Sequence, residues 1–359
     1  MRLAIISLSS GSSQMIAEKA KAFFDEVDML NIKKIEVHLG YKDKHQIIYE
    51  GKPIKDYDCV YCKGSYKYAL LSRSIITVLE DKCYTPLLPE SYTLGHDKFL
   101  TLIELQKAGI EIPKTYLAGT VEEAKRLVAN SHFPAIIKIP SGTHGKGVMF
   151  ADSVESANSI LDALEVFKQP YIVQEYVETG ATDLRALVLG DKVIAAMQRK
   201  ASKGELRANI HMGGKGKKVT LDSDTEHIAI KSAKSIKAEL CAIDILKGLR
   251  PYVVEVNVSP GIQGLTKVTK LDIANEIAKF LFERTKEFHA MKADKDYKKV
   301  MKELKQKKSN EFLANIIIKA GIIRLPESVT ASTNFKHDDE VVIKVAEGSV
   351  SIEKHDIEK

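Results

Sequence analysis

The stretch EVNVSPG, residues 255–261, is typical of a β-strand that runs into a sharp turn. Because side chains alternate along a strand, Glu255 and Asn257 share one face, and Val254, Val256 and Val258 share the other. A strand that packs valines on one face usually shows threonine, serine or lysine to solvent on the other. A carboxylate and an amide directly before Ser-Pro-Gly instead indicate a face with a chemical task.

A second carboxylate is predicted to lie beside this pair. The sequence CAIDILKGLRPYVVEV (241–256) is typical of a β-hairpin centred on Leu249 and Arg250. This register places Asp244 opposite Glu255 on the same face, where two like charges repel each other unless a cation lies between them. Hard oxygen ligands suit Mg²⁺, with Mn²⁺ as the alternative metal. The other interpretation is a polar sheet face whose carboxylates pair with lysine or arginine.

A glycine-rich segment follows another apolar strand. AIIKI (135–139) contains Lys138 and leads, through Pro140, into SGTHGKG (141–147), which has three glycines in seven residues. Glycine frees the backbone to turn its N–H groups toward phosphate oxygens. The segment lacks the Gly-Lys-Ser/Thr ending of a P-loop. A phosphate-binding loop and a flexible hairpin loop both fit it, and the preceding lysine favours phosphate.

A third polar segment is QRKASKGELRANIHMGG (198–214), which contains Arg199, Arg207 and Asn209. Guanidinium groups bind carboxylate or phosphoryl oxygens through paired hydrogen bonds. Taken alone, the segment would be an ordinary solvated basic loop. Together the three segments predict one site with a magnesium ion, a phosphate-binding loop and an acceptor pocket. No Cys-His or Ser-His-Asp arrangement and no HExxH motif suggests other chemistry.

Composition bounds the kind of protein. The chain has 359 residues, 44% hydrophobic and 28% charged, which is enough to bury a core in two or three domains. No apolar run approaches the roughly 20 residues of a membrane span, and the first residues lack the features of a signal peptide. The four cysteines form no disulfide framework, and CVYC (59–62) is typical of a strand rather than half of a zinc site. We therefore predict a cytoplasmic protein.

The order of predicted elements indicates an α/β chain. Strands are predicted at 3–8, 35–39, 46–49 and 58–63, with a helix that Ser12 or Ser13 caps after the first strand and another helix near 68–81. From residue 91, helices are predicted at 96–109, 121–130, 224–240 and 271–285, and strands at 135–139, 171–177, 184–190, 192–200, 241–246 and 252–258, with a hairpin turn at Gly190-Asp191.

Seven motifs in order resemble the ATP-grasp enzymes, specifically the RimK-like alpha-L-glutamate ligases. They are DK (97–98), IIK (136–138), SGTHGKG (141–147), QEYVE (174–178), DLR (183–185), RKASKGELRANIHMGG (199–214) and DILKG…VVEVNVSPGIQGL (244–265). The resemblance covers roughly residues 1–285. It implies a pre-ATP-grasp α/β domain at 1–90 and an ATP-grasp domain at 91–288. A lysine-rich linker at 289–312 follows, in which residues 292–308 hold eight lysines and three acidic residues. We expect it to be a solvated helix, with a phosphate-rich partner as the minority alternative.

The resemblance also implies roles by position. Asp244, Glu255 and Asn257 would hold Mg²⁺, which would explain the opening stretch. Arg199, Arg207 and Asn209 would be catalytic, holding the acceptor carboxylate and the transferred phosphoryl group. The residues implied to bind ATP are Lys98 and Lys138 at the phosphates, Ser141, Gly142, Gly145 and Gly147 in the loop that closes over the triphosphate, Gln174, Glu175, Tyr176 and Val177 at adenine, Glu178 near the ribose, and Asp183 and Arg185.

The implied reaction is ATP-driven amide formation. A carboxylate attacks the γ-phosphate to give an acyl phosphate, and the amine of an amino acid, usually glutamate in this family, then displaces phosphate. One departure is Met212, where the family often has arginine. The missing charge puts the acceptor in doubt, and a protein C-terminus, a carrier protein, a pterin or deazaflavin cofactor and a small acid all stay open. An amine other than glutamate is also open.

The last segment forms a separate pattern. Residues 315–354 are predicted to fold as strand, Gly321, strand, a helix led by Pro326, and a hairpin turning at Glu347-Gly348. This resembles the AbrB-type swapped hairpin, a β-rich module in which two chains interleave, and we assign it to 313–359. So short a unit rarely sustains its own core, so we expect a homo-oligomer. The alternative function is a nucleic-acid-associated regulator with an ATP-binding core; the few basic residues and the acidic HDDE (337–340) make it the less favoured.

Overall fold

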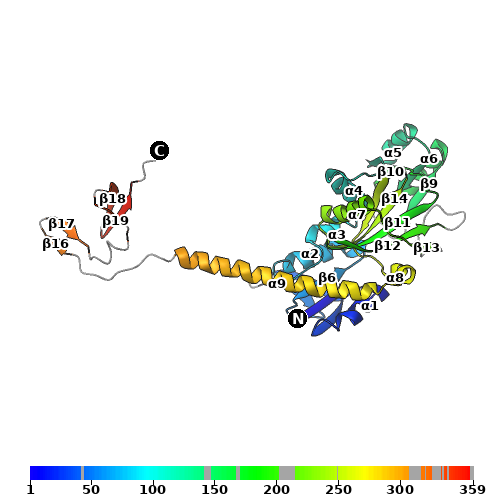
Figure 1. Cartoon of the computed structure of the whole chain (residues 1–359). Coiled ribbons are helices and arrows are strands. Elements are labelled where there is room, and N and C mark those ends of the chain that lie inside the picture. Colours follow the sequence, from blue (N-terminus) through cyan, green and yellow to red (C-terminus); the bar gives the residue numbers. More distant parts are fainter. Residues whose placement is uncertain are drawn as a thin grey trace. The chain divides into compact units, whose positions relative to one another are not determined.

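The computed structural model describes residues 1–41, 44–140, 147–166, 170–201, 215–248, 250–306, 317–319, 321–325, 333, 335–337 and 339–355. The chain divides into two compact units, Met1–Ala290 and Met291–Lys359 (Figure 1). Helices and strands mix throughout the first unit, so the predicted α/β class is confirmed. Within the described residues, no helix combines the length and the apolar character needed to cross a membrane.

The first residues form a parallel sheet with β1 (Arg2–Ser7) between β2 (Glu26–Asn31) and β6 (Cys59–Lys63). Strand β2 was not predicted, because its acidic residues hide the apolar ones. Helix α1 (Gly11–Ala20) begins at Ser10, whose side chain accepts a hydrogen bond from the Ser13 amide. The prediction that Ser12 or Ser13 caps this helix was therefore wrong, since both are buried within its first turn.

Smaller elements complete this part of the chain. The antiparallel strands β3, β4 and β5 form a separate sheet. Helix α2 is the helix predicted near 68–81, with almost the same bounds. The bounds are η1 Ile32–Lys34, β3 Ile35–Tyr41, β4 Lys44–Tyr49, β5 Lys52–Pro53, η2 Tyr66–Tyr68, α2 Ala69–Leu79 and α3 Pro89–Leu94.

A four-stranded antiparallel sheet follows, in the order β7-β10-β8-β9. Helices α5 and α6 contribute to its own small core, in which Ile137, Leu161 and Val173 are buried. Helix α4 precedes this sheet and ends before Gly109, whose φ of +66° matches the predicted stop. The bounds are α4 Lys98–Lys107, β7 Thr115–Ala118, α5 Val121–Ala129, β8 Ala135–Lys138, β9 Val148–Ala151, α6 Val154–Glu165 and β10 Tyr171–Glu175.

The largest sheet has five antiparallel strands in the order β13-β12-β11-β14-β15. The turn between β11 and β12 falls at Gly190, as predicted, with a φ of +58°. Helix α7 ends at Ser235, five residues before the predicted end, because the chain must turn before β14. The bounds are β11 Thr182–Leu189, β12 Lys192–Lys200, β13 Lys215–Lys218, α7 Ser223–Ser235, β14 Leu240–Lys247, β15 Pro251–Asn257, α8 Gln263–Thr269 and α9 Ile273–Gln306.

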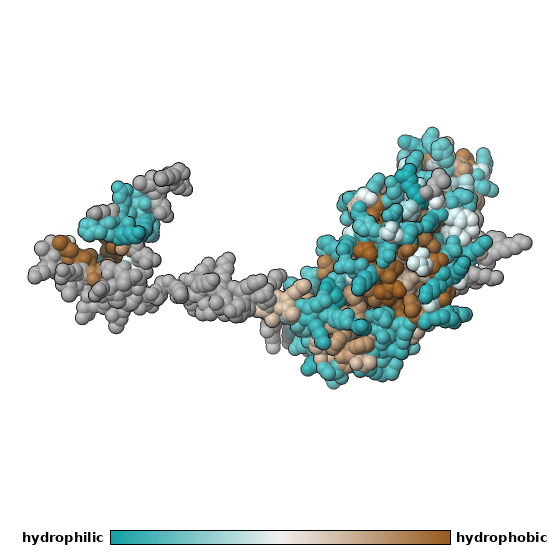
Figure 2. Space-filling model, viewed as in Figure 1, coloured by the Kyte–Doolittle hydropathy of each residue, from teal (hydrophilic) through white to brown (hydrophobic). Residues whose placement is uncertain are grey.

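The second unit contains two hairpins. Strands β16 (Ile317–Lys319) and β17 (Ile322–Arg324) turn at Gly321, and β18 (Val341–Ala346) and β19 (Ser349–Lys354) turn at Gly348, as predicted. The helix predicted from Pro326 lies outside the described residues. Among the described residues of this unit, none belongs to a buried core. Apolar side chains of β16 and β17 lie at the surface in Figure 2, where Ile318 is 68% exposed.

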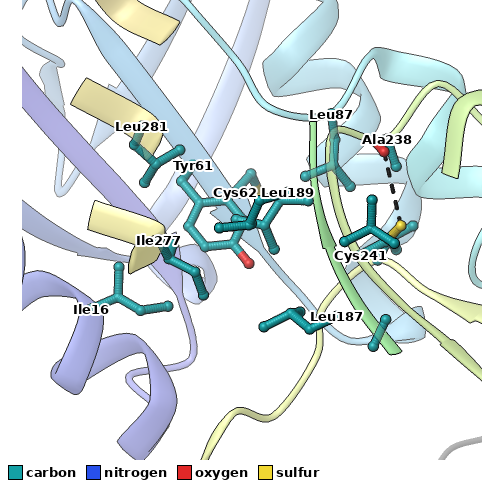
Figure 3. Packing of buried hydrophobic residues seen from close by; sticks show 14 of the residues in the cluster. Ile16, Tyr61, Cys62, Leu87, Leu187, Leu189, Ala238, Cys241, Ile277 and Leu281 are labelled. Carbon is teal, nitrogen blue, oxygen red and sulfur yellow. Dashed lines mark hydrogen bonds between the residues drawn. The ribbon is translucent and has the colours of Figure 1, made fainter. Parts of the chain in front are cut away.

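One continuous core joins the parallel sheet to the five-stranded sheet. Tyr61 of β6 lies among Ile16 of α1 and Ile277 and Leu281 of α9 (Figure 3). Leu187 of β11 belongs to the same core. The carboxyl end of the parallel sheet is thereby held against the segment that follows β15.

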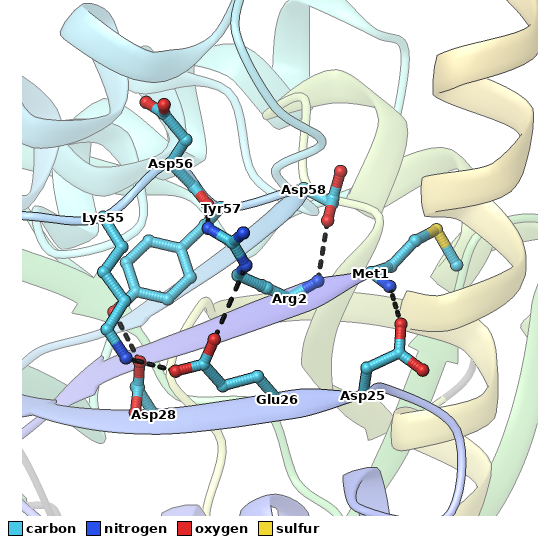
Figure 4. Close-up of polar contacts among 9 residues, drawn as sticks. All are labelled: Met1, Arg2, Asp25, Glu26, Asp28, Lys55, Asp56, Tyr57 and Asp58. Carbon is cyan, nitrogen blue, oxygen red and sulfur yellow. Dashed lines mark hydrogen bonds and ion pairs between the residues drawn. The ribbon is translucent and has the colours of Figure 1, made fainter.

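The amino-terminal ends of the parallel strands carry a network of paired charges (Figure 4). The Lys55 amine contacts the carboxylates of Glu26 and Asp28. The Arg2 side chain contacts Glu26 at 3.5 Å, and the Arg2 amide donates to Asp58 at 2.7 Å. Arg2, Glu26, Asp28 and Lys55 thus each have an opposite charge beside them.

Candidate functional site

The predicted pairing of the two carboxylates is confirmed. Asp244 lies opposite Glu255, and Ala242 lies opposite Asn257, across the β14–β15 ladder. A β-bulge between Asp244 and Ile245 shifts the register, so that Ile245 pairs with Val253. Val253 therefore enters the core in place of the predicted Val254. The bulge leaves the two carboxylates and the Asn257 amide on one face of the sheet.

Asp244 is held by two arginines from neighbouring strands. Its carboxylate accepts hydrogen bonds from Arg185 Nε at 2.7 Å and Arg185 Nη2 at 2.6 Å, and it contacts Arg199 Nη2 at 2.9 Å. Burial alone would raise the pKa of Asp244, but the two guanidinium groups outweigh it and hold that pKa at about 2. Asp244 is therefore ionised and compensated by protein charges.

Arg199 also binds a second buried carboxylate. Its Nε and Nη2 donate to the two oxygens of Asp183, each at 2.6 Å. Burial raises the pKa of Asp183 to about 6, although Arg199 and Arg185 oppose that shift. Asp183, Arg199, Asp244 and Arg185 thus form a chain of alternating charges across β12, β11 and β14. This is the arginine-paired alternative for Asp244, present alongside the predicted site.

Glu255 differs from Asp244 in having no such partner. It is half-buried, and among the described residues no side chain pairs or hydrogen-bonds with its carboxylate. Asn257 Oδ1 accepts a hydrogen bond from the Ser259 amide at 3.0 Å, which fixes the amide orientation. No cluster of three or more His, Cys, Asp or Glu that could hold a metal occurs in the described part of the chain. The unpartnered carboxylate and the fixed amide oxygen nevertheless fit a hard cation such as Mg²⁺.

Lys138 extends the site onto the four-stranded sheet. Only 5% exposed, it donates from Nζ to Gln174 Oε1 at 2.9 Å, and Gln174 donates to Thr115 Oγ1 at 2.7 Å. Burial, together with the nearby Lys98, lowers the pKa of Lys138 to about 8, while Glu255 acts to raise it. Lys98 and Glu255 therefore both lie within electrostatic reach of Lys138.

The glycine segment begins and ends beside these lysines. The Lys98 amide donates to the Pro140 carbonyl at 3.1 Å, and the Ile139 amide donates to the Gly147 carbonyl at 3.2 Å. Gly147 has a φ of +77°, and a Cβ there would lie 2.8 Å from the Ile139 side chain, so both conformation and space require glycine. Five predicted site residues lie outside the described residues, namely Ser141, Gly142, Gly145, Arg207 and Asn209. Met212 also lies outside them.

The predicted adenine segment connects the two sheets. Gln174 and Glu175 end β10, and Tyr176 packs edge-to-face on Phe150 of β9 with ring centroids 5.4 Å apart. Val177 lies against Gly248, where an added Cβ would approach the valine side chain to 3.1 Å. Glu178 accepts a hydrogen bond from the Gly180 amide at 2.8 Å. This segment therefore runs from one sheet to the turn between β14 and β15.

Two polar residues near the site were not predicted. His96 lies two positions before Lys98, and within the described part of the chain its buried Nε2 has no hydrogen-bond partner. Burial, with a smaller effect of Lys98, lowers the pKa of His96 to about 4, so the ring is neutral. Lys63, the last residue of β6, is buried and donates to the Ser259 carbonyl at 3.0 Å. The sequence signal for Lys63 was a lysine that ends an otherwise apolar strand.

Solved structures with the same fold are ATP-grasp proteins. The ATP-grasp ligase PsnB, solved with its minimal precursor, superposes with a TM-score of 0.62 at 18% identity, over 79% of this chain and 98% of that one. A RimK domain protein of the ATP-grasp fold from Sphaerobacter thermophilus gives a TM-score of 0.59 at 16% identity, over 78% of this chain and 99% of that one. These likenesses establish the fold.

Sequence relatives establish the family. A probable alpha-L-glutamate ligase from Mannheimia succiniciproducens is 35% identical over 280 residues, which is 75% of this chain and 92% of the relative. Another from Coxiella burnetii is 32% identical over 298 residues, which is 81% of this chain and 98% of the relative. The RimK-like ATP-grasp domain matches residues 95–281. The chain therefore belongs to the RimK-like ATP-grasp family of ligases.

Proposed function

We propose that this ligase uses ATP and Mg²⁺ to join the amine of glutamate to a carboxylate of a protein, peptide or cofactor. The observation that carries the proposal is the arrangement of Glu255, Lys138 and Lys98. A carboxylate that pairs with no described side chain lies within electrostatic reach of the buried Lys138, and so does a second lysine, Lys98. Such a combination suits a triphosphate and its metal ion, because the lysines attract phosphate oxygens and the carboxylate attracts the cation.

The residues would divide the work as follows. Lys98 and Lys138 bind the ATP phosphates, and the segment from Gln174 to Glu178 holds the nucleoside. Glu255 and Asn257 would hold Mg²⁺, which supplies charge neutralisation at the transferring phosphoryl group. Asp244 adds negative charge beside them while Arg185 and Arg199 fix its orientation.

The reaction then proceeds in two displacements. An oxygen of the acceptor carboxylate attacks the γ-phosphorus, the bond to the β-phosphate oxygen breaks, and ADP and an acyl phosphate result. The amine of the incoming amino acid attacks the acyl carbon, loses a proton, and expels phosphate as the amide forms. Arg199 stays a proposed contributor to binding of the transferred phosphoryl group, and Arg185 a proposed contributor to ATP binding. Arg207 and Asn209 remain proposed contributors to acceptor binding.

The domain limits 1–90, 91–288, 289–312 and 313–359 remain proposals, as does an AbrB-like function of the last segment. The apolar side chains of its two hairpins support association with a second copy of the chain. The four cysteines, Cys59, Cys62, Cys83 and Cys241, are free buried thiols. Free thiols in this number fit the proposed cytoplasmic location.

The deciding experiment is an assay of ADP release. The full chain is incubated with Mg-ATP, each of the twenty amino acids in turn, and a panel of carboxylate acceptors that includes cell extract. We expect release that depends on both glutamate and one acceptor fraction, with a product one glutamyl residue or more heavier by mass spectrometry. ADP release that needs a different amino acid would correct the amine. Tight ATP binding without turnover in any combination would contradict the ligase and favour the regulator.

A further inference from the structure

Lys63 is a buried cation without a carboxylate partner. Its residue is only 9% exposed, and its amine has one hydrogen-bond acceptor, the Ser259 carbonyl at 3.0 Å. In the part of the chain that the structure describes, no aspartate or glutamate pairs with it. A buried ammonium group is costly unless an anion compensates it. An anion bound beside Lys63 would therefore lower the cost of burying its ammonium group.

At the amino-terminal ends of the same strands, charged side chains are paired with one another. There, Lys55 contacts both Glu26 and Asp28, and Arg2 contacts Glu26, although these groups are more exposed than Lys63 (Figure 4). Both groups of charges lie at ends of the same three strands, β1, β2 and β6. Among the described residues, Lys63 is thus an exception within its own sheet, and an anionic group of a substrate would compensate its charge.

The surroundings of Lys63 are suited to a small polar ligand. Ser7 lies directly opposite it on β1. The Ser259 hydroxyl is buried and finds no hydrogen-bond partner among the described residues. The turn that contains Ser259 is held to the start of α1, because the Ile262 amide donates to Ser12 Oγ at 3.1 Å. The carboxyl ends of parallel strands are the usual place for ligands in α/β folds.

The position relative to Asn257 indicates which ligand. Lys63 reaches the Ser259 carbonyl, and the Ser259 amide binds Asn257 Oδ1 at 3.0 Å. Lys138 instead lies within electrostatic reach of Glu255 and Lys98. Of the two candidate metal ligands, Glu255 therefore has Lys138 nearby, and Asn257 has Lys63 nearby. A carboxylate bound by Lys63 would therefore lie beside Asn257, apart from the triphosphate.

We propose that Lys63 is the anion-binding group of a substrate subsite and that it binds a carboxylate of one of the two molecules that the enzyme joins. This rests on the proposed function, in which both molecules carry carboxylates. The carboxylate is either that of the acceptor or the α-carboxylate of the incoming amino acid. The Ser259 hydroxyl, which lacks a partner, supplies a further hydrogen bond to it.

Three variants test the subsite. Lys63→Gln removes the charge but keeps a donor for the Ser259 carbonyl, Lys63→Met removes both, and Lys67→Met removes an exposed lysine four residues away. The probes are L-glutamate and N-acetyl-L-glutamate, an acceptor mimic without a free amine. Their binding to the full chain saturated with Mg and a non-hydrolysable ATP analogue is measured by calorimetry.

We expect at least one probe to bind about tenfold or more weakly to both Lys63 variants than to the unmodified chain and to Lys67→Met, while the affinity for the ATP analogue stays unchanged. Loss for L-glutamate alone assigns the subsite to the amino acid, and loss for N-acetyl-L-glutamate assigns it to the acceptor. The melting temperature of Lys63→Met should not fall, because an unpaired buried charge has been removed.

Equal affinities of the unmodified chain and Lys63→Gln for both probes, including no binding by either, would overturn the subsite. A lower melting temperature of Lys63→Met with unchanged probe binding would also overturn the subsite. Lys63 would then have only a structural role, holding the 259–262 turn through its hydrogen bond to Ser259. These binding measurements need no turnover. Failure of the ligase assay therefore remains distinguishable from failure of the subsite.

Discussion

Two carboxylates that face each other in one ladder have different environments. Asp244 is surrounded by Arg185 and Arg199, whereas Glu255 has no partner in the described part of the chain. The difference follows from strand position, because β14 lies beside the arginine-bearing β11 and β15 lies at the sheet edge. Glu255 is consequently the carboxylate that a cation can bind without displacing a protein charge.

The first prediction concerns Glu255. Glu255→Gln keeps the size and removes the charge, so we expect ADP release to fall on the order of a hundredfold or more while far-UV circular dichroism stays unchanged. The exposed Glu276→Gln serves as the matched control and should keep full activity. Raised Mg²⁺ should restore part of the lost rate if binding is weakened. Turnover equal to that of the control would remove the metal assignment.

The second prediction concerns the charge of Lys138. Because burial lowers its pKa to about 8 and bound phosphate would raise that pKa, nucleotide binding above pH 8 must take up a proton. The affinity for ADP should therefore fall by up to about tenfold per pH unit from pH 8 upward. In the absence of nucleotide, the unfolded chain binds the extra proton between pH 8 and 10.5, so this lysine makes the unfolding free energy rise with pH.

Calorimetric titration with ADP at pH 7 to 9.5 measures this dependence. Lys138→Arg is the diagnostic variant, because a guanidinium group stays charged throughout that range. Its affinity for ADP should vary less with pH than that of the unmodified chain. Identical pH profiles for the two proteins would mean that Lys138 does not supply the titrating charge.

At the scale of elements, three strands of the large sheet are joined by charge as well as by their ladders. Arg199 of β12 binds Asp183 of β11 through two hydrogen bonds and reaches Asp244 of β14. All three groups are buried or nearly so, so each depends on the others for compensation. Arg199 therefore compensates two buried carboxylates at once, Asp183 and Asp244.

The third prediction follows from that position. Arg199→Met leaves Asp183 buried without its partner and should lower the free energy of unfolding by about 3 kcal/mol or more. Arg250→Met is the control, because its ion pair with Glu111 is exposed and should contribute less than about 1 kcal/mol. Urea unfolding followed by circular dichroism compares the two midpoints. Equal midpoints for the two variants would show that the network adds no stability.

Elements with strong periodicity could be predicted from the sequence. The β14–β15 pairing, the turn at Gly190 and the stop of α4 before Gly109 all depend on local signals, namely alternation and glycine. The edge strand β2 could not, because it is half-buried and alternates acidic with apolar residues. Nor could the bulge after Asp244, which is visible only as a change of register. Helices α3, α6 and α8 were also missed, the first and last being short.

The site residues divide along the same line. Glu255, Asn257 and Lys138 were identified because short motifs contain them, the first two on β15 and the third at the end of β8. The arginine pairing of Asp244 depends on the strand order β12-β11-β14, which no local pattern contains. Lys63 was missed because its burial results from a contact with Ser259, 196 positions later in the sequence. Long-range contacts of this kind require the tertiary fold.

At the scale of the whole molecule, the two units differ in what holds them together. The first has one core that joins two of its sheets. In the second, side chains on one face of the β18–β19 hairpin are exposed, with Val345 at 77% and Ile343 at 58%. Val345 lies opposite Val350, and Ile343 lies opposite Ile352, so the face is continuous. Hairpins of this size are not stable alone in water.

The last prediction is that the second unit associates with a second copy of the chain. A chain that ends at residue 310 should form a smaller oligomer by light scattering and keep its ADP release, because every described site residue precedes residue 290. Val345→Asp, which places a charge on the apolar face, should have the same effect in the full chain. Ser351→Asp, on the opposite face, should leave the oligomer intact, since Ser351 lies beside Lys344. An unchanged oligomer after truncation would exclude this unit as the interface, and salt-sensitive DNA binding lost on truncation would favour the regulator instead.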